Sequence, residues 1–304
     1  MKELYPMFGI ISTVLTPFKE DTLEIDVPSF RKYIQVLLDG GVAGFLVPCN
    51  ASEMEKLTWE ERKLILEETV KIAKGKALII PSVSDKGTNM DFTIQCKEYL
   101  DLGADGVNIN ITYESDEQYM KAVESVDKLN PAFTCLQDAS RTTNGLPDEL
   151  ILKCYEQFET VRCAKIEVKD SGPKYSRLLK ATDGKLNISG ARESDQMIEG
   201  YDRGMHALMP TGLPEIFSGI YKLYHEKSRE AAKALFFKAL PIIVWTRQKG
   251  MNLPFHKLYM QRIGAFESTA MRVESHLDKY QLAYANELVD YALQLRDQIP
   301  EYWK

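Results

Sequence analysis

The sequence has little that would place the chain in a membrane or on a nucleic acid. No apolar run approaches the ~20 residues that a helix needs to cross a bilayer. Residues 1–18 lack a signal-peptide pattern, because their short apolar part follows acidic and proline residues and ends in Thr-Pro. Basic residues form no stripe with interleaved aromatic residues, and the net charge is −6. We therefore expect a cytoplasmic protein with neither a nucleic-acid nor a membrane partner.

Motifs for metals and nucleotide cofactors are also missing. The four histidines have no metal-ligand spacing and no HExxH motif, and the five cysteines include no CxxC pair. No GxGxxG or GxxxxGK[ST] sequence follows the first predicted strand. We therefore predict no metal site and no cofactor, and we expect the cysteines to be buried small hydrophobic residues in a reducing compartment.

What the sequence does contain is a regular alternation of two patterns. Short runs rich in β-branched and apolar residues alternate with longer segments that have apolar residues at helical spacing. The predicted strands are 9–18, 44–48, 77–83, 106–111, 132–138, 161–168, 186–191 and 206–211. Eight apolar strands alternating with helices indicate an α/β protein with a parallel sheet, and specifically a (β/α)₈ TIM barrel. A doubly wound sheet is the competing fold.

The end of the chain follows another pattern. After residue 228 the sequence predicts only helices, at 229–248, 253–264 and 277–299. We therefore divide the chain into a barrel, residues 1–228, and a C-terminal helical extension, residues 229–304. The extension carries no catalytic motif, so packing or oligomer contact is its expected role.

Active sites of such barrels lie at the carboxyl ends of the strands. The stretch "VRCAKIEVKD" (161–170) raises the question of why a buried strand would contain a lysine. Alternation of side chains places Val161, Cys163 and Lys165 on one face, which would put Lys165 at the barrel mouth and leave Lys169 in the following loop. Burial removes hydration from an ammonium group and favours the neutral amine, which can attack a ketone to form a Schiff base.

Alternatives remain open for these residues. Lys165 could instead be held in a structural ion pair by Glu53 or Glu167. Arg141, in the loop after the fifth strand, could bind a substrate carboxylate bidentately or could form a loop salt bridge with Asp138. Polar or glycine residues at other strand ends add Thr16 and Gly190 as candidate substrate contacts.

Taken in order, these residues resemble the dihydrodipicolinate synthase / N-acetylneuraminate lyase family of Schiff-base-forming, aldolase-type lyases. The resemblance covers nearly the whole chain. It is carried by "GIISTVLTPF", "GVAGFLVPCNASEMEKLTWEER", "LQDASRTT", "TVRCAKIEV" and "ISGARESDQMIEGYDRGMHALMPT". It implies that Lys165 forms an imine with a 2-keto acid, that the loop after strand 2 (Asn50, Ala51 and Ser52) holds the substrate carboxylate, and that Arg141 helps to bind a carboxylate.

Two departures from the family pattern stand out. The strand 2 loop reads Cys49-Asn50-Ala51-Ser52-Glu53 in place of Gly-Thr-Thr-Gly-Glu. The tyrosine of strand 5, which relays protons in the family, aligns with Leu136, which cannot do so. Asp138 and Tyr113 are the candidate replacements as acid–base groups.

The sequence therefore predicts a divergent lyase. Its substrate would be pyruvate or a sugar-derived 2-keto acid, and its reaction an aldol cleavage or condensation, or a dehydration. The alternative is a non-catalytic keto-acid-binding sensor that has lost the relay tyrosine. A metal-dependent class II aldolase is disfavoured because His and Asp/Glu ligands are not clustered. As in the family, we expect a homo-oligomer, a dimer or a tetramer.

Overall fold

The computed structural model describes residues 2–140, 145–191 and 195–303. In this part of the chain nine strands form one sheet, ordered β3-β2-β1-β9-β8-β7-β6-β5-β4, and their pairs are parallel. The strands are β1 (Gly9–Thr13), β2 (Gly44–Leu46), β3 (Leu78–Ile80), β4 (Ser82–Ser84), β5 (Val107–Asn110), β6 (Thr134–Ala139), β7 (Val161–Glu167), β8 (Asn187–Gly190) and β9 (Ala207–Leu208).

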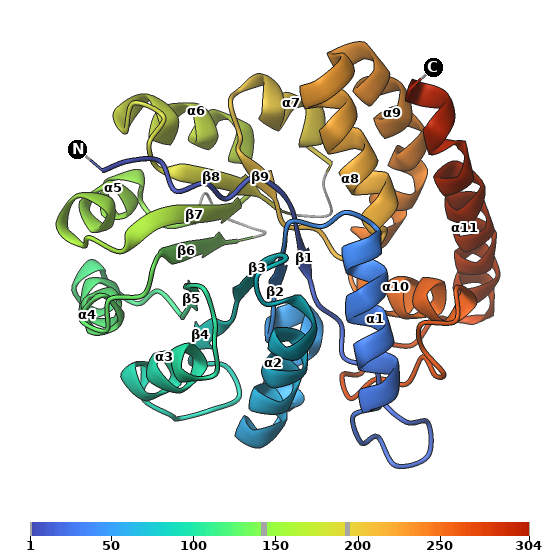
Figure 1. Cartoon of the computed structure of the whole chain (residues 1–304), viewed down its shortest axis with the longest axis horizontal. Helices are drawn as coiled ribbons and strands as arrows, with labels where there is room; N and C mark the ends of the chain where they lie inside the picture. Colours follow the sequence, from blue (N-terminus) through green and yellow to red (C-terminus); the bar gives the residue numbers. More distant parts are fainter. Residues whose placement is uncertain (1, 141–144, 192–194, 304) are drawn as a thin grey trace.

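The two edge strands of this order are halves of one predicted strand. β3 and β4 lie on either side of Pro81, which has no N–H group to continue the ladder. The sheet therefore closes on itself, and Figure 1 shows its strands at the centre of a ring of helices. This closure confirms the predicted (β/α)₈ barrel and excludes a doubly wound sheet.

The helices of the ring follow the strands in turn. They are α1 (Val27–Asp39), α2 (Trp59–Ala73), α3 (Phe92–Asp101), α4 (Asp116–Asp127), α5 (Asp148–Gln157), α6 (Ser171–Ala181), α7 (Met197–Asp202) and α8 (Pro214–Lys222). At the start of α2, Thr58 Oγ1 accepts a hydrogen bond from the Glu61 N–H, and the Glu61 carboxylate accepts one from the Thr58 N–H. This reciprocal capping box satisfies two N–H groups that helix geometry leaves unpaired.

The C-terminal extension lies on one side of the barrel (Figure 1). It contains α9 (Arg229–Thr246), α10 (Asn252–Arg262) and α11 (Lys279–Gln298), and α9 and α11 pack against α8. Buried residues of α8 and α11, among them Ile216 and Leu295, belong to the same apolar core as the outer faces of the strands. The extension is therefore joined to the barrel by a continuous apolar core.

A second, smaller core fills the inside of the barrel. It includes Ile11, Leu46, Ile80, Cys163 and other side chains from the inner strand faces, and the N-terminal residue Met7 packs with them. All five cysteines are buried and unpaired, as predicted. The barrel is therefore closed by side chains below the level of its mouth.

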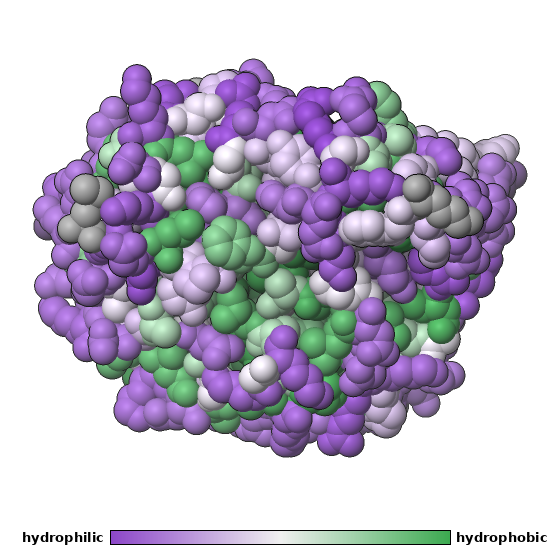
Figure 2. Space-filling view, turned by 45° about the horizontal axis from the view of Figure 1, so that its top comes forward, coloured by the Kyte–Doolittle hydropathy of each residue, from purple (hydrophilic) through white to green (hydrophobic). Residues whose placement is uncertain are grey.

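The outer surface is mainly hydrophilic. Figure 2 shows one face, on which apolar side chains gather in the middle and hydrophilic ones surround them. Large apolar side chains are also exposed on the extension, including Phe237 and Val244 of α9. Among the described residues, no helix combines the length and the apolar character needed to cross a membrane.

Candidate active site

A pocket of ≈ 490 Å³ opens at the carboxyl ends of the strands, between the barrel mouth and the extension. The barrel contributes the ends of β1, β6 and β7 and the segment after β9. The extension contributes the link from α9 to α10 and the segment before α11. The pocket lining includes Thr13, Asn50, Ala51, Lys165, Glu167, Thr211, Arg247, Val273, Glu274 and Ser275. The extension, which the sequence assigned to packing or oligomer contact, thus also forms one wall of the pocket.

Lys165 lies on the inner face of β7, and its side chain is 6% exposed. A register shift between β6 and β7 pairs Thr134 with Val161 but Cys135 with Cys163, so that Arg162 is an extra residue. Such a bulge changes which side chains share a face. Val161 consequently belongs to the outer core, whereas Cys163 belongs to the inner one. Cys163 and Lys165 lie on one face of β7, as predicted, whereas Val161 lies on the other face.

The amine of Lys165 has a carboxylate beside it. Its Nζ lies 3.0 Å from Glu167 Oε1, and Glu167 comes from the same inner face two residues further along β7. The partner of Lys165 is thus Glu167, one of the two acids considered from the sequence. The other, Glu53, is paired elsewhere.

A chain of hydrogen bonds crosses neighbouring strands to reach this carboxylate. Gln137 Nε2 donates to Glu167 Oε1 at 2.7 Å, and Asn108 Nδ2 donates to Gln137 Oε1 at 2.8 Å. Asn108 Nδ2 also lies 3.1 Å from Ser82 Oγ, which extends the chain to β4. Asn108 and Ser82 are fully buried, so the chain fixes the Glu167 carboxylate relative to the barrel wall.

Below the lysine, the barrel presents neutral groups. Burial raises the pKa of the Cys135 thiol to about 12, although the positive charge of Lys165 opposes this shift. Burial likewise raises the pKa of the Cys49 thiol, and the positive charge of Lys165 again opposes the shift. Both thiols are therefore protonated at neutral pH. Within the described residues that line the pocket there is no tyrosine and no histidine.

Hydroxyl groups and one arginine form other parts of the wall. Thr13, the last residue of β1, and Thr211, which follows β9, place their hydroxyl oxygens 2.7 Å apart. Arg247, at the carboxyl end of α9, lines the pocket from the extension and forms an ion pair with Asp195. These groups can hydrogen-bond a hydroxylated or anionic ligand above Lys165.

The predicted carboxylate-binding loop is only partly in the pocket. Asn50 and Ala51, in a 3₁₀ turn (Asn50–Ser52), line it. The side chain of Asn50 is held from outside, since Asn110 Nδ2 donates to its Oδ1 at 3.0 Å. Asn50 therefore has its amide nitrogen left as a possible donor to a ligand.

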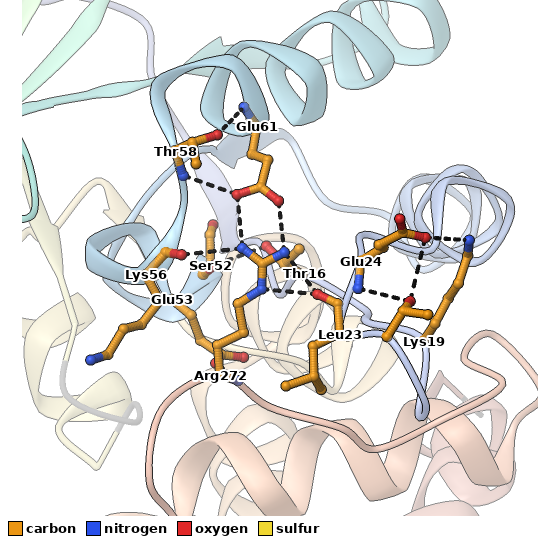
Figure 3. Close-up of polar contacts among 11 residues, drawn as sticks. Thr16, Lys19, Leu23, Glu24, Ser52, Glu53, Lys56, Thr58, Glu61 and Arg272 are labelled. Atoms are coloured by element: carbon orange, nitrogen blue, oxygen red, sulfur yellow. Dashed lines mark hydrogen bonds and ion pairs between the residues drawn. The ribbon is translucent and has the colours of Figure 1, made fainter.

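Ser52 and Thr16 have structural positions beneath this loop. The Ser52 hydroxyl donates to Val14 O at 2.6 Å and accepts from the Cys49 N–H. Thr16 Oγ1 donates to Ser52 O at 2.8 Å, and neither side chain is exposed. Figure 3 shows the two residues side by side behind the loop. They hold the loop in place, and the structure does not bring them into the pocket.

Glu53 joins the same loop to the extension. Its Oε1 lies 2.6 Å from Lys257 Nζ of α10, and its Oε2 accepts bonds from the backbone N–H groups of Arg272 and Val273. Arg272 in turn forms a bidentate pair with Glu61 at 2.6 and 2.7 Å (Figure 3). Val273, Glu274 and Ser275 line the pocket, so these ion pairs hold the extension's wall against the strand 2 loop.

Asp138 faces away from the pocket. It lies on the outer face of β6, 1% exposed, where its carboxylate is 2.6 Å from Lys174 Nζ of α6 and accepts a bond from the Leu146 N–H. Burial raises the pKa of Asp138, while the Lys174 ammonium acts in the opposite direction. The inward turn that an acid–base role needs is absent, because odd and even residues of a strand point to opposite faces.

The same alternation separates Leu136 from Lys165. Leu136 belongs to the core outside the barrel, whereas Gln137 is paired with Lys165 across β6 and β7 and donates to Glu167. The residue of β6 that stands beside Lys165 is thus Gln137. The alignment of the family tyrosine with Leu136 stays a prediction.

Two further candidates lie apart from the lysine. Tyr113 is 42% exposed and donates its hydroxyl to Asp116 at 2.8 Å, outside the pocket. A Cβ on Gly190 would meet Met205 and Tyr175, so this position faces the helix layer. Arg141 lies outside the described residues, and its predicted carboxylate contact stays a prediction.

The sequence places Glu167 and Gln137 at strand ends, but we assigned no role to Gln137 and only an ion pair to Glu167. Thr13, Thr211 and Arg247 were missed as site residues. Alternation from Lys165 could have indicated Glu167, because both occupy the same strand face. Arg247 could not be found this way, since only packing of the extension brings it to the barrel mouth.

Comparison with known proteins identifies the family. The model of the dihydrodipicolinate synthetase family matches residues 6–275. The 4-hydroxy-tetrahydrodipicolinate synthase of Methanococcus aeolicus is 24% identical over 299 residues, which cover 91% of this chain and 100% of that protein. An uncharacterised DapA-like lyase of Thermococcus kodakarensis is 25% identical over 74% of this chain and 79% of its own length.

Solved structures show the same fold. The dihydrodipicolinate synthase of Rhodopseudomonas palustris superposes with a TM-score of 0.84 at 24% identity, covering 96% of this chain and 99% of its own. The 4-hydroxy-tetrahydrodipicolinate synthase of Methylacidiphilum fumariolicum has a TM-score of 0.87 at 16% identity and covers 98% and 100% of the two chains.

The barrel, the match along most of the chain and the enzymes it resembles define an aldolase-type lyase. More particularly, the chain belongs to the dihydrodipicolinate synthetase family.

Proposed function

We propose that this lyase works through a Schiff base between Lys165 and a 2-keto acid. The observation that carries the proposal is the placement of Lys165: a nearly buried amine on the inner face of β7 that lines a pocket at the barrel mouth. A lysine in such a position is costly unless it is paired or used. Here the carboxylate that pairs with it among the described residues, Glu167, also faces the pocket, where a ligand can reach both groups.

The chemistry follows from the amine at this point once it has given up its proton. Lys165 Nζ would attack C2 of the keto acid, form a C–N bond, and expel the carbonyl oxygen as water. The resulting iminium nitrogen withdraws electrons from C3, so that a C3–H or C3–C4 bond can break. Cleavage of C3–C4 is an aldol cleavage, and loss of a proton at C3 followed by loss of hydroxide at C4 is a dehydration.

Polar groups around the lysine support a hydroxylated keto acid as substrate. The Asn50 amide and the Thr13 and Thr211 hydroxyls face the pocket, and Arg247 offers a cation for a carboxylate. The curated relatives are named 4-hydroxy-tetrahydrodipicolinate synthases. Because the strand 2 loop departs from their family pattern and Gln137 stands beside Lys165, we propose a different, sugar-derived keto acid in place of their substrate.

Borohydride trapping tests the proposal. The protein is incubated with pyruvate, 2-oxobutanoate or 2-keto-3-deoxygluconate and then reduced, and intact mass and peptide mass spectrometry locate the adduct. We expect one adduct per chain at Lys165 with at least one of these acids and none in Lys165→Ala. Absence of any adduct in the wild-type chain, or an unchanged adduct in Lys165→Ala, would refute the Schiff base.

The sensor alternative predicts a different outcome of the same experiment. A binding protein would gain thermal stability with a keto acid, following RT ln(1 + [L]/Kd), without consuming it. Consumption of the trapped acid that disappears in Lys165→Ala excludes this alternative.

We also propose that the chain forms a homo-oligomer. Phe237 and Val244 lie seven residues apart on one face of α9, and their exposed fractions are 57% and 58%. Apolar side chains gathered on one helix face are typical of a buried interface between copies.

A further inference from the structure

We propose that Glu167 is the acid–base catalyst of this site and that Gln137 is its positioning residue. The inference rests on the proposed Schiff-base function and adds the group that moves its protons. Glu167 is the carboxylate bonded to Lys165, it lies on the same face of β7, and it lines the pocket. A phenol is therefore not required beside Lys165.

Distance separates Glu167 from the other carboxylates near the mouth. Its Oε1 is 3.0 Å from Lys165 Nζ, within the reach that direct proton transfer requires. Glu274 lines the rim but is solvent-exposed, and no hydrogen bond or ion pair joins it to Lys165 among the described contacts. Asp138 is on the opposite face of β6 and is occupied by Lys174.

Each proton transfer can be assigned to this carboxylate. Glu167 first takes a proton from the Lys165 ammonium, which leaves a neutral amine and a neutral acid. As the amine adds to C2, the acid gives this proton to the former carbonyl oxygen, and the carboxylate then takes a proton from the cationic nitrogen, which leaves a carbinolamine. The acid returns this second proton to the carbinolamine hydroxyl, which leaves as water while the C–N double bond of the iminium forms. The regenerated carboxylate then removes a proton from C3 of the iminium, and the C–H electron pair forms the enamine double bond.

Gln137 gives the carboxylate a fixed direction. Its Nε2 donates to Oε1, the same oxygen that faces Lys165, and its own Oε1 is held by buried Asn108. Gln137 thus holds the Glu167 carboxylate toward Lys165 and the pocket, without touching the reacting atoms.

Exchange of the C3 hydrogens into D₂O measures this step without knowledge of the second substrate. The keto acid that traps best among pyruvate, 2-oxobutanoate and 2-keto-3-deoxygluconate is incubated in D₂O, and loss of its C3 proton signal is followed by NMR. Rates are normalised to the number of sites that borohydride converts to the Lys165 adduct at the end point, so unfolded protein does not count.

The variants separate catalysis from structure. We expect Glu167→Gln, which keeps the size of the side chain, to exchange about 10²–10⁴-fold more slowly than wild type. In Glu167→Ala, added formate should restore part of the rate, because a small carboxylate can occupy the vacated space. The matched control Asp138→Asn changes a carboxylate on the neighbouring strand and should retain the wild-type rate per trapped site.

Gln137→Leu tests the positioning role. Loss of the donor should lower the exchange rate per trapped site, because the Glu167 carboxylate is no longer held in one direction. A purely structural role would lower the number of trapped sites and leave the rate per remaining site unchanged.

The outcomes of this experiment distinguish the inference from the proposed function. Failure of the wild-type chain to trap any of the three acids would refute the Schiff base, and the role of Glu167 with it. Trapping and exchange by wild type, together with a Glu167→Gln rate within threefold of it or no formate rescue of Glu167→Ala, would refute only the role of Glu167. A rate lost in Asp138→Asn and kept in Glu167→Gln would assign the proton transfers to Asp138 instead.

Discussion

Neutralising Glu53 should destabilise the protein strongly. Glu53 and Lys257 have side chains that are 0% exposed and lie 2.6 Å apart. The second carboxylate oxygen accepts two backbone N–H groups, from Arg272 at 2.7 Å and Val273 at 2.9 Å. Lys257 and the two backbone N–H groups are all donors. In Glu53→Gln only one end of the amide is an oxygen that can accept, and the other end is an NH₂ donor. Either Lys257 or the two N–H groups must therefore face another donor.

The magnitude follows from what is left unpaired. Removing one partner of a buried ion pair leaves an uncompensated charge and costs roughly 3–5 kcal/mol of stability. We therefore expect Glu53→Gln to lower the free energy of unfolding by about 3–5 kcal/mol. In Glu53→Gln/Lys257→Met the buried ammonium is gone and the amide oxygen can turn toward the two N–H groups. The double variant should consequently be more stable than Glu53→Gln alone.

Urea unfolding followed by circular dichroism measures both effects. Asp101→Asn is the matched control, since Asp101 pairs with Lys97 at the surface with side chains 63% and 66% exposed. Asp101→Asn should leave the urea concentration at the midpoint of unfolding unchanged from wild type, because solvent screens the charges of an exposed ion pair. A Glu53→Gln midpoint equal to that of Asp101→Asn, or a double variant less stable than Glu53→Gln, would refute the reasoning.

Further predictions concern pH, a helix cap and assembly. Burial lowers the pKa of His256 to about 3, below its ordinary value of 6.5. The free energy of unfolding should therefore fall as the pH drops from 6.5 towards 3, because the unfolded chain binds a proton that the folded chain does not. His256→Gln should make the free energy of unfolding depend less on pH in this range. Thr58→Ala removes the α2 cap and should cost about 1 kcal/mol, with faster hydrogen exchange in the first turn of α2; unchanged exchange would contradict the capping role. Light scattering after size exclusion should give more than one chain per particle, and Phe237→Glu/Val244→Glu should lower that number; an oligomer that resists both changes uses another surface.

The sequence determined the elements and the strand face on which Lys165 lies. Alternation of apolar strands with helices sufficed for the barrel, because a parallel sheet must be covered on its outer face. Alternation within one strand brought Lys165 to the inner face, and it would also have placed Glu167 there. Both are local patterns. When one face of a strand or helix is buried, the spacing of its apolar residues shows which side chains point to that face.

Register and distant contacts could not be obtained in this way. Pairing of β6 with β7 places Gln137 beside Lys165, and a bulge at Arg162 moves Val161 to the outer core. Asp138 was a reasonable acid on the sequence, but its pairing with Lys174 depends on where α6 packs. Such choices depend on the partner strand and helix, which a single sequence does not specify.

The sequence by itself therefore decided the class of fold, the family and the position of Lys165 on the inner face of its strand. Only the tertiary structure decided which groups surround that lysine. Glu167 and Gln137 meet because two strands pair in one register, and Arg247 and Glu274 reach the mouth because Glu53, Lys257 and Arg272 hold the extension against it. The physical reason is that side-chain direction follows local periodicity, whereas proximity between distant segments follows from packing and ion pairing.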